Sequence, residues 1–423
     1  MLFYKIEMES ERALENNERK WRRIRARIKE QTEETNEKFK GHASYFVSDI
    51  QDRRIFIGAA VFVEAGTVDK RNLMAGLAHF CVRSELRTKL IAVDEITVRE
   101  FSRMLLIASR RDYIDDDDKY KSELDMDFID GLRCGECREI LIPNYFTKRQ
   151  ALAEARRLLC GASFRPELER IFDPRAPREF VGNPVHYVVA SDDSLVRVAM
   201  RELLLGALIQ KRRLAGKRCC ILDLNPNNGY SIRGLYDIYQ SQKGCALVLS
   251  LTGEDEEEQS HVNASCEFIA NVASNIIEFR RDTLTILEMK RSDERLYQRL
   301  MEELPNVMFV RLEEEITFKR EAKTYLRRLA MKNGIKNCSS LLGCLAPSDS
   351  GYLSSDLNKL FDKWYDEYLR TELHVQYREL TSGQKKIQSK PKGDAYRDLM
   401  EMVGLQPVKK VILQAVEFHK AQK

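Results

Sequence analysis

The clearest pattern of apolar and polar positions lies in the second half of the chain. Short apolar runs, typical of buried strands, alternate there with segments whose apolar residues follow helical spacing. The runs lie at 185–189, 219–224, 246–251, 283–287 and 307–312, and a long helix is expected from Ser194 to about Arg212. Five strands separated by helices predict an α/β fold with a parallel sheet covered on both faces.

Helical spacing continues after the last of these strands. Two helical stretches are expected, and the second carries apolar residues at i, i+3, i+4 and i+7, a stripe that should face a core. Its members are Leu357, Leu360, Phe361, Trp364, Tyr365, Tyr368 and Leu369. The expected order is therefore a five-stranded module followed by a small helical bundle.

Strand and helix signals are mixed in the block from about Ser44 to Pro177. The run 53–63 and the stretch 89–93 predict strands. Thr97, with Glu100 three residues later, has the spacing of a capping box at the start of a helix over 97–108. The acidic run 115–118 lacks periodicity and predicts an exposed loop.

The first forty residues are highly charged and predict a helix. Its apolar seam comprises Leu14, Trp21, Ile24 and Ile28. The seam is too short for a long coiled coil, so we expect the helix to dock on its own protein or on a neighbouring subunit.

Composition narrows the class of protein. The 423 residues, 43% of them hydrophobic, suffice for two or three domains. The net charge of +4, from 70 basic and 66 acidic residues, favours neither nucleic acid nor a membrane as an obligatory partner. The sequence has no apolar run long enough to predict a transmembrane helix, and its first residues do not predict a signal peptide. Several of the ten cysteines lie in apolar runs, which is typical of a reducing cytoplasm: Cys219, Cys220, Cys245 and Cys266.

Few residues suggest metal or acid–base chemistry. Cys134 and Cys137 form the only C-x-x-C and are weak candidates for a metal or redox site, since a zinc site needs a second pair or matching histidines. His186 and His261 are isolated, and we expect both to be structural. The sequence shows no Ser/His/Asp or H-E-x-x-H arrangement, so a hydrolase is not expected.

The segment 394–423 (DAYRDLMEMVGLQPVKKVILQAVEFHKAQK) resembles the opening of an AAA+ ATPase module in the family of CbbX and stage V sporulation protein K. In that family a short helix leads into a Gly-Leu-x-x-Val-Lys step and a second helix, and a phosphate-binding loop follows. The resemblance implies that ATP and magnesium belong to a module downstream of this chain. It also implies a hexameric ring for the whole protein, and the five-stranded module with its helical bundle matches the AAA+ order of core and lid.

The five-stranded module lacks the residues of an ATP site. Such a site needs glycines in the turn after the first strand and a lysine on the phosphates. The turn instead contains Ser191, Asp192, Asp193 and Ser194. Two like charges about 4 Å apart repel by about 4 kcal/mol at an effective dielectric near 20, so these aspartates would oppose a triphosphate. We expect Ser191, Asp192 or Asp193 to cap the following helix instead.

The acidic pair expected after the third strand is also missing, because Leu249, Ser250, Leu251 and Thr252 occupy that place. Asp223, at the end of the second strand, remains an alternative as a displaced metal ligand. We therefore expect a degenerate AAA+-like module, and we assign no catalytic, cofactor-binding or metal-binding residue to this chain.

The predicted organisation has six parts. They are a charged helix (1–42), an α/β domain (43–178), the degenerate AAA+-like module (179–312), a helical lid (313–376), a linker (377–393) and the opening helices of a second AAA+ module (394–423). We expect a cytoplasmic, non-hydrolysing region of an AAA+ protein-remodelling ATPase that binds protein clients or itself. Two alternatives stay open: a complete non-catalytic adaptor or scaffold, and an enzyme whose chemistry lies between Ser44 and Pro177.

Overall fold

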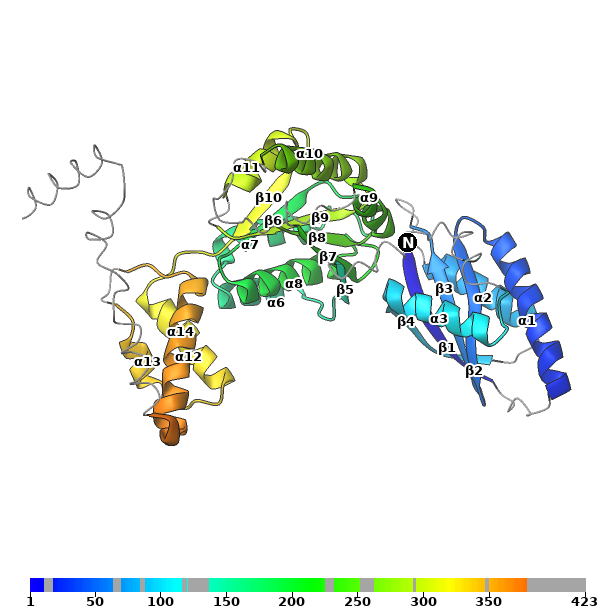
Figure 1. Ribbon diagram of the computed structural model, residues 1–423, viewed down its shortest axis with the longest axis horizontal. Helices are drawn as coiled ribbons and strands as arrows, with labels where there is room; N and C mark the ends of the chain where they lie inside the picture. Colours follow the sequence, from blue (N-terminus) through cyan, green and yellow to red (C-terminus); the bar gives the residue numbers. More distant parts are fainter. Residues whose placement is uncertain are drawn as a thin grey trace, which may run out of the picture. The chain divides into compact units, whose positions relative to one another are not determined.

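The computed structural model describes most of the first 378 residues (Figure 1). The described ranges are 1–10, 18–63, 70–83, 88–115, 120, 137–224, 232–251, 262–291, 294–346 and 350–378. Cys134, His261 and the segment 394–423 that carries the AAA+ resemblance lie outside them. The chain divides into two compact units, one of Met1–Tyr325 with Ala346–Leu357 and one of Leu326–Leu345 with Asn358–Lys423.

The first unit contains an antiparallel sheet with the strand order β2-β3-β1-β4. The predicted strands at 53–63 and 89–93 are confirmed as β3 and β4, and Thr97 caps α3 by accepting the backbone N–H of Glu100 at 3.2 Å. The elements are β1 (Leu2–Ser10), α1 (Glu18–Lys38), β2 (Ala43–Gln51), β3 (Arg54–Val61), α2 (Lys70–Arg83), β4 (Thr88–Ile96) and α3 (Val98–Arg110).

The prediction of a charged helix over residues 1–42 is wrong for its first part. Leu2–Ser10 form β1, which pairs with β3 on one side and β4 on the other. Leu2, Phe3 and Ile6 are almost completely buried, so this strand is part of the core of the sheet. The helix itself is confirmed as α1, and its seam residue Ile28 is buried against the same core.

Helices cover both faces of the antiparallel sheet. The ring of Phe46, on β2, meets Phe101 of α3 edge to face at 5.3 Å. The neighbouring Tyr45 points the other way, and its hydroxyl donates to the backbone carbonyl of Leu73 in α2 (2.9 Å). A Cβ on Gly76 of α2 would overlap the Tyr45 ring, so glycine allows this close approach.

The first unit also contains a mainly parallel sheet with the order β10-β6-β9-β8-β7-β5. The five predicted strands are confirmed as β6 to β10, which run parallel to one another. Their bounds are β6 (His186–Ala190), β7 (Arg218–Leu224), β8 (Ala246–Leu251), β9 (Leu284–Met289) and β10 (Phe309–Glu313).

A sixth strand, β5 (Cys137–Leu141), pairs antiparallel with β7 at the edge of this sheet. Its sequence falls inside the block 43–178, so the predicted boundary at residue 178 does not separate the two sheets. Two helices from the same block, α6 (Lys148–Arg157) and α7 (Gly161–Ile171), contribute Ala151, Phe164 and Leu168 to the core on one face of the parallel sheet.

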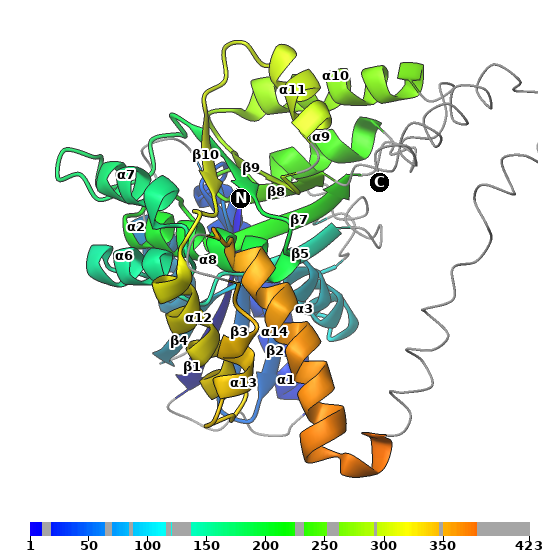
Figure 2. The same ribbon diagram turned by 90° about the vertical axis from the view of Figure 1, so that its left-hand side faces the viewer.

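The parallel sheet separates two layers of helices (Figures 1 and 2). On one face α6, α7 and α8 (Ser194–Gln210) pack against Tyr187 and Val189 of β6. On the other face α9 (Ile232–Ser241), α10 (Val262–Phe279) and α11 (Glu294–Glu302) share a core with Val188 and Ala190. Alternate residues of each strand therefore serve opposite layers, as the continuous apolar runs predicted.

Buried charges join the two sheets of the first unit. The Arg218 guanidinium, on β7, donates to the Glu139 carboxylate of β5 (2.6 Å), to the carbonyl of Met1 (2.8 Å) and to that of Ser241 (2.7 Å). Glu95 of β4 accepts the backbone N–H groups of Lys217 (2.7 Å) and Arg218 (3.1 Å). A Cβ on Gly216 would overlap Glu95, so this glycine lets the two segments approach.

The second unit is helical. It contains parts of α12 (Lys319–Lys332) and α14 (Ser354–Tyr368), together with α13 (Ser339–Gly343), a π-helical turn (Leu369–Leu373) and a 3₁₀ turn (Val375–Tyr377). The predicted stripe on α14 is buried only at Leu357 and Phe361, and its other members are half-buried. The Trp364 indole N–H donates to the Ser340 hydroxyl at 3.1 Å.

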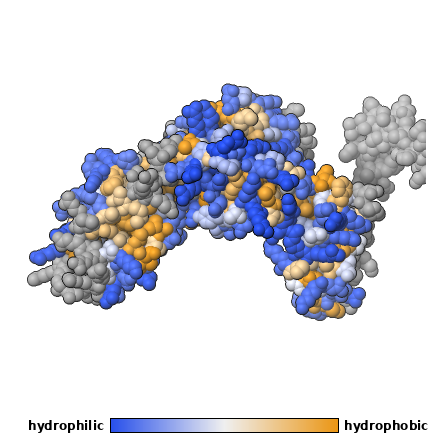
Figure 3. Space-filling view, turned by 180° about the vertical axis from the view of Figure 1, so that it is seen from behind, coloured by the Kyte–Doolittle hydropathy of each residue, from blue (hydrophilic) through white to orange (hydrophobic). Residues whose placement is uncertain are grey.

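The surface seen in Figure 3 is mostly hydrophilic over the described residues. In the part of the chain that the structure describes, no helix is both long and apolar enough to cross a membrane.

Candidate functional site

The parallel sheet has one topological switch point, at the carboxyl end of β6. The helix after β6, α8, lies on one face, whereas the helices after β7, β8 and β9 lie on the other. Open α/β sheets bind ligands outside the carboxyl ends of their strands at such a point. The turn from Ser191 to Ser194, which the sequence marks as the phosphate-loop position, lies there.

The N-terminus of α8 is capped from within the turn. Asp193, the N-cap residue, has extended backbone angles (φ −105°, ψ 122°). Its Oδ1 accepts the backbone N–H of Leu195 at 2.7 Å and that of Val196 at 3.4 Å. Of the three candidates for this role, the structure assigns it to Asp193. The carboxylate thus occupies the N–H groups that would otherwise point at a bound anion.

The other members of the turn are also engaged. The Asp192 carboxylate accepts the backbone N–H of Arg291, just after β9, at 2.9 Å. The buried Ser191 hydroxyl accepts the N–H of Asp193 at 3.1 Å, and the Arg197 guanidinium donates to the Ser191 carbonyl. These bonds hold the turn to its own helix and to the neighbouring strand. Ser194 is exposed and begins α8.

Beneath the turn, a buried ion pair joins α8 to β9. The Arg201 guanidinium lies 2.7 Å from the Glu288 carboxylate, and their side chains are only 2% and 7% exposed. Glu288 pairs in register with Ser250, at the place where a nucleotide site would need a metal-binding acid on β8. Because Arg201 neutralises Glu288, the nearest buried carboxylate is engaged within the fold.

The remaining candidates lie apart from the switch point. Asp223 is exposed near the end of β7 and has interactions of its own. His186 is buried at the start of β6, and its Nδ1 accepts the backbone N–H of Thr285 at 3.0 Å. Burial lowers the pKa of His186 to about 4, so the ring is neutral at pH 7. This agrees with the structural role that we expected.

The cysteine predictions need one correction. Cys137 forms a disulfide with Cys220, so Cys220 is not the free buried thiol that the composition suggested. Cys219 and Cys245 are free and buried, and burial raises the pKa of their thiols to about 12 and about 11. Among the described residues, no group of three or more potential ligands fits a metal ion. The Cys266 side chain lies outside those residues.

Sequence reasoning missed the two buried ion pairs. Arg201 lies in the largely apolar helix SLVRVAMRELLLGALIQ, which also carries Arg197 and Glu202, and Glu288 lies inside a strand. Arg218 begins a strand, and Glu139 lies in the short strand CREIL. A charged residue within a buried helix or strand needs a partner of opposite charge, so the presence of these residues in apolar segments could have indicated buried ion pairs. The sequence could not indicate which acid pairs with which arginine.

Comparisons with known proteins give little. No protein-family model and no curated protein match the chain. A solved structure of Rhizobiales Trip13 is 13% identical over 53% of this chain and 87% of that one, with a TM-score of 0.28. The E. coli MS115-1 HORMA:CdnC:Trip13 complex contains a chain that is 14% identical, with coverages of 53% and 95% and a TM-score of 0.24. Trip13 is an AAA+ ATPase, but at these TM-scores the likeness carries no argument about this chain.

Proposed function

We propose that this chain is the non-hydrolysing region of an AAA+-type protein-remodelling ATPase, and that it recognises protein partners and contributes to a ring. ATP and magnesium would be bound by a module that follows the segment 394–423. This chain would thus contact the partners, and a different module would hydrolyse ATP.

The order of elements supports the AAA+-like part of the proposal. Numbered along the chain from β6, the parallel strands lie in the order 5-1-4-3-2, and helices follow the last strand. The order differs from the 2-1-3-4-5 order of flavodoxin-like sheets, and the sequence of five strands and then helices is the one that the AAA+ resemblance implies. The resemblance of the segment 394–423 to CbbX and stage V sporulation protein K remains an expectation, since it lies outside the described residues.

The proposal that this chain does not hydrolyse ATP rests on one observation, the capping of α8 by Asp193. A triphosphate at the switch point would have to displace the Asp193 carboxylate from two N–H groups and then lie beside it. The turn 191–194 offers neither the glycines nor the lysine that make such a site favourable. A nucleotide at this position would therefore find neither free N–H groups at Leu195 and Val196 nor a lysine to hold its phosphates.

Titration of the full chain with a fluorescent ATP analogue and magnesium tests this proposal. We expect no saturable binding and no release of phosphate. A matched titration without magnesium controls for weak ionic contact with surface lysines and arginines. Magnesium-dependent binding in the micromolar range, accompanied by hydrolysis, would overturn the proposal.

A further inference from the structure

A disulfide joins the edge strand of the parallel sheet to its neighbour. Cys137, the first residue of β5, is bonded to Cys220 of β7, which lies 83 positions later in the chain. The two Cα atoms are 6.6 Å apart, a separation that disulfides commonly span. In the antiparallel register Cys220 lies opposite Glu139, so the bond crosses between the strands diagonally. The bond therefore holds the start of β5 against β7.

Other cysteines of the chain are typical of a compartment in which such a bond is not permanent. Cys338 and Cys344 flank α13 and are both thiols, and Cys344 is exposed. Thiols of this kind persist where glutathione and thioredoxin-like proteins keep cysteines reduced. Disulfides that form in such compartments are usually transient or redox-sensing. We therefore expect the Cys137–Cys220 bond to respond to the redox conditions.

The two buried thiols Cys219 and Cys245 do not exchange with the bond. Cys219 belongs to the core on one face of the sheet, whereas Cys137 and Cys220 belong to the core on the other face. Burial raises the pKa of Cys219 to about 12 and that of Cys245 to about 11, so both are protonated at pH 7. Because only a thiolate attacks a disulfide, neither of these two thiols competes with an external reductant.

β5 is the side from which a reductant can reach the bond. It has five residues, lies at the edge of the sheet and pairs with β7 alone among the described strands. Cys137 is 4% exposed and Cys220 is 0% exposed. Arg138 is exposed, and Ile140 and Leu141 are half-buried, so opening of β5 uncovers little apolar surface. Local opening costs least where few apolar contacts hold a segment, so the Cys137 sulfur is the one that a reductant attacks.

Glu139 connects the same strand to the antiparallel sheet. Its Oε1 accepts from the Arg218 guanidinium at 2.6 Å, and its Oε2 accepts the backbone N–H of Val98 at 2.8 Å. Val98 is the first residue of α3, so its N–H has no acceptor within the helix. Glu139 lies two residues after Cys137, and a strand that is held at Cys137 also holds Glu139 in place. The disulfide therefore supports a contact between β5 and α3.

We propose that Cys137 and Cys220 are a reversible redox site that controls how firmly β5 is held to β7 and to α3. In the oxidised chain the bond keeps Glu139 on the Val98 N–H. In the reduced chain β5 opens more often, and Val98 loses its acceptor during each opening. This inference goes beyond the proposed function and does not depend on nucleotide or partner binding.

The reaction is thiol–disulfide exchange with a dithiol. One thiolate of the dithiol attacks the Cys137 sulfur, the Cys137–Cys220 bond breaks, and the Cys220 sulfur leaves and takes up a proton. The second thiol of the dithiol then attacks the mixed disulfide and releases Cys137 as a thiol. Two electrons and two protons pass to the chain, and the dithiol becomes a disulfide. Oxidation is the reverse reaction with a disulfide, such as oxidised glutathione, as the acceptor of the electrons.

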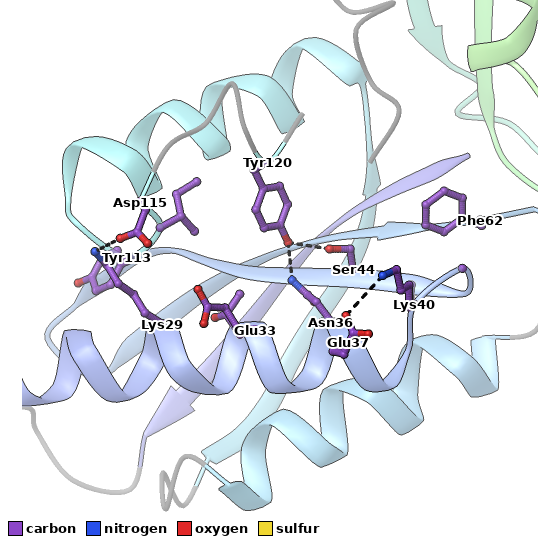
Figure 4. Close-up of a pocket in the computed structure, with 14 residues that line it drawn as sticks. Lys29, Glu33, Asn36, Glu37, Lys40, Ser44, Phe62, Tyr113, Asp115 and Tyr120 are labelled. Atoms are coloured by element: carbon purple, nitrogen blue, oxygen red, sulfur yellow. Dashed lines mark hydrogen bonds and ion pairs between the residues drawn. The ribbon is translucent and has the colours of Figure 1, made fainter. Parts of the chain in front are cut away.

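The cavity beside α1 provides an internal reference for a test (Figure 4). There the Asn36 amide donates to the Tyr120 hydroxyl at 3.0 Å, and that hydroxyl lies 2.7 Å from the Ser44 hydroxyl. The Asn36 amide oxygen also accepts the backbone N–H of Tyr45 at 2.7 Å. The residues that line this cavity include none from β5. Exchange at the Tyr45 amide should therefore be independent of the disulfide.

Hydrogen exchange of the full chain in an excess of reduced or of oxidised glutathione tests the proposal, and alkylation with mass spectrometry maps the disulfide. We expect the Cys137–Cys220 bond in the oxidising buffer, both cysteines as thiols in the reducing buffer, and recovery of the bond when the buffers are exchanged. In the reduced chain the Val98 amide should exchange at least about tenfold faster, with the Tyr45 amide unchanged. A bond that persists in the reducing buffer, or equal exchange at Val98 in both states, would overturn the proposal.

Variants identify the cysteines that are responsible. Cys137→Ser removes the bond at the edge strand, so the Val98 amide should exchange fast in both buffers. Cys220→Ala provides a second route to the same result, because Cys220 is completely buried and small apolar residues fit there best. Cys344→Ser, at an exposed thiol, is the matched control and should keep the redox dependence. Redox dependence that survives in Cys137→Ser, or a mapped Cys134–Cys137 bond in the parent chain, would contradict the assignment.

Discussion

At the scale of single residues, the charged side chains near the switch point and in the core have hydrogen-bond or ion-pair partners within the fold. Asp193 gives its carboxylate to the start of α8, and Asp192 gives its own to the backbone of Arg291. Arg201 and Arg218 are buried, and each has a glutamate partner. The charges of the turn 191–194 and of the ion pair beneath it are thus engaged within the fold.

Loss of the α8 cap should lower stability measurably. We expect Asp193→Ala to reduce the free energy of unfolding by about 1 kcal/mol, since two backbone N–H groups lose their acceptor. Asp193→Ser, which retains a capping oxygen, should recover most of this loss. Urea denaturation followed by circular dichroism measures the change. An alanine variant as stable as the parent protein would disprove the capping role.

The ion pair between Arg218 and Glu139 should matter far more than exposed pairs do. Glu139→Ala leaves a guanidinium whose side chain is 0% exposed without its carboxylate, and such losses cost about 3–5 kcal/mol. Asp173→Ala, which breaks the exposed pair with Arg175, is the control and should leave the unfolding midpoint unchanged. Thermal denaturation compares the two variants, and equal midpoints would show that the buried pair contributes nothing to stability.

At the scale of elements, strands with long apolar runs were predictable, whereas β1 and β5 were not. β6, β7, β8 and β9 are buried at nearly every position, so their sequences are mostly apolar. β1 escaped prediction because its charged residues Lys5, Glu7 and Glu9 were grouped with the charged helix that follows, although their alternation with apolar residues is a strand pattern. β5 escaped because it is short and contains Arg138 and Glu139.

The candidate site was partly predictable. The absence of glycine and lysine from the turn 191–194 can be read from the sequence, and so can the need for a helix cap. The hydrogen bonds that join Asn36, Tyr45 and Tyr120 could not be predicted, because the three residues come from separate segments. Pairing across such distances is set by tertiary packing, which local patterns do not encode.

The contact between β6 and β9 should make stability depend on pH. Burial lowers the pKa of His186 to about 4, whereas the unfolded ring titrates near its usual 6.5. Below pH 6.5 the unfolded state therefore binds the proton more readily, and stability falls as the pH is lowered from 6.5 towards 4. The expected loss is on the order of 3 kcal/mol.

Denaturation of the chain between pH 7 and pH 4 measures this dependence. His186→Gln should make the slope in this range shallower, whereas the same substitution at the exposed His42 should leave it unchanged. Identical slopes in all three proteins would mean that His186 is not a neutral buried group in the folded state.

At the scale of the whole molecule, the chain combines two sheets in one unit with a helical second unit. The first unit contains the turn 191–194, where Asp193 caps the start of α8. On our proposal, the parallel sheet provides a scaffold without hydrolysing nucleotide.

Hydrogen exchange at the start of α8 tests most directly the claim that no nucleotide binds at the turn 191–194. The backbone amides of Leu195 and Val196 are bound to Asp193 and would be the first to contact a phosphate. We predict the same exchange rates at these two amides with and without millimolar magnesium–ATP. Slower exchange at both amides on addition of the nucleotide would contradict the account.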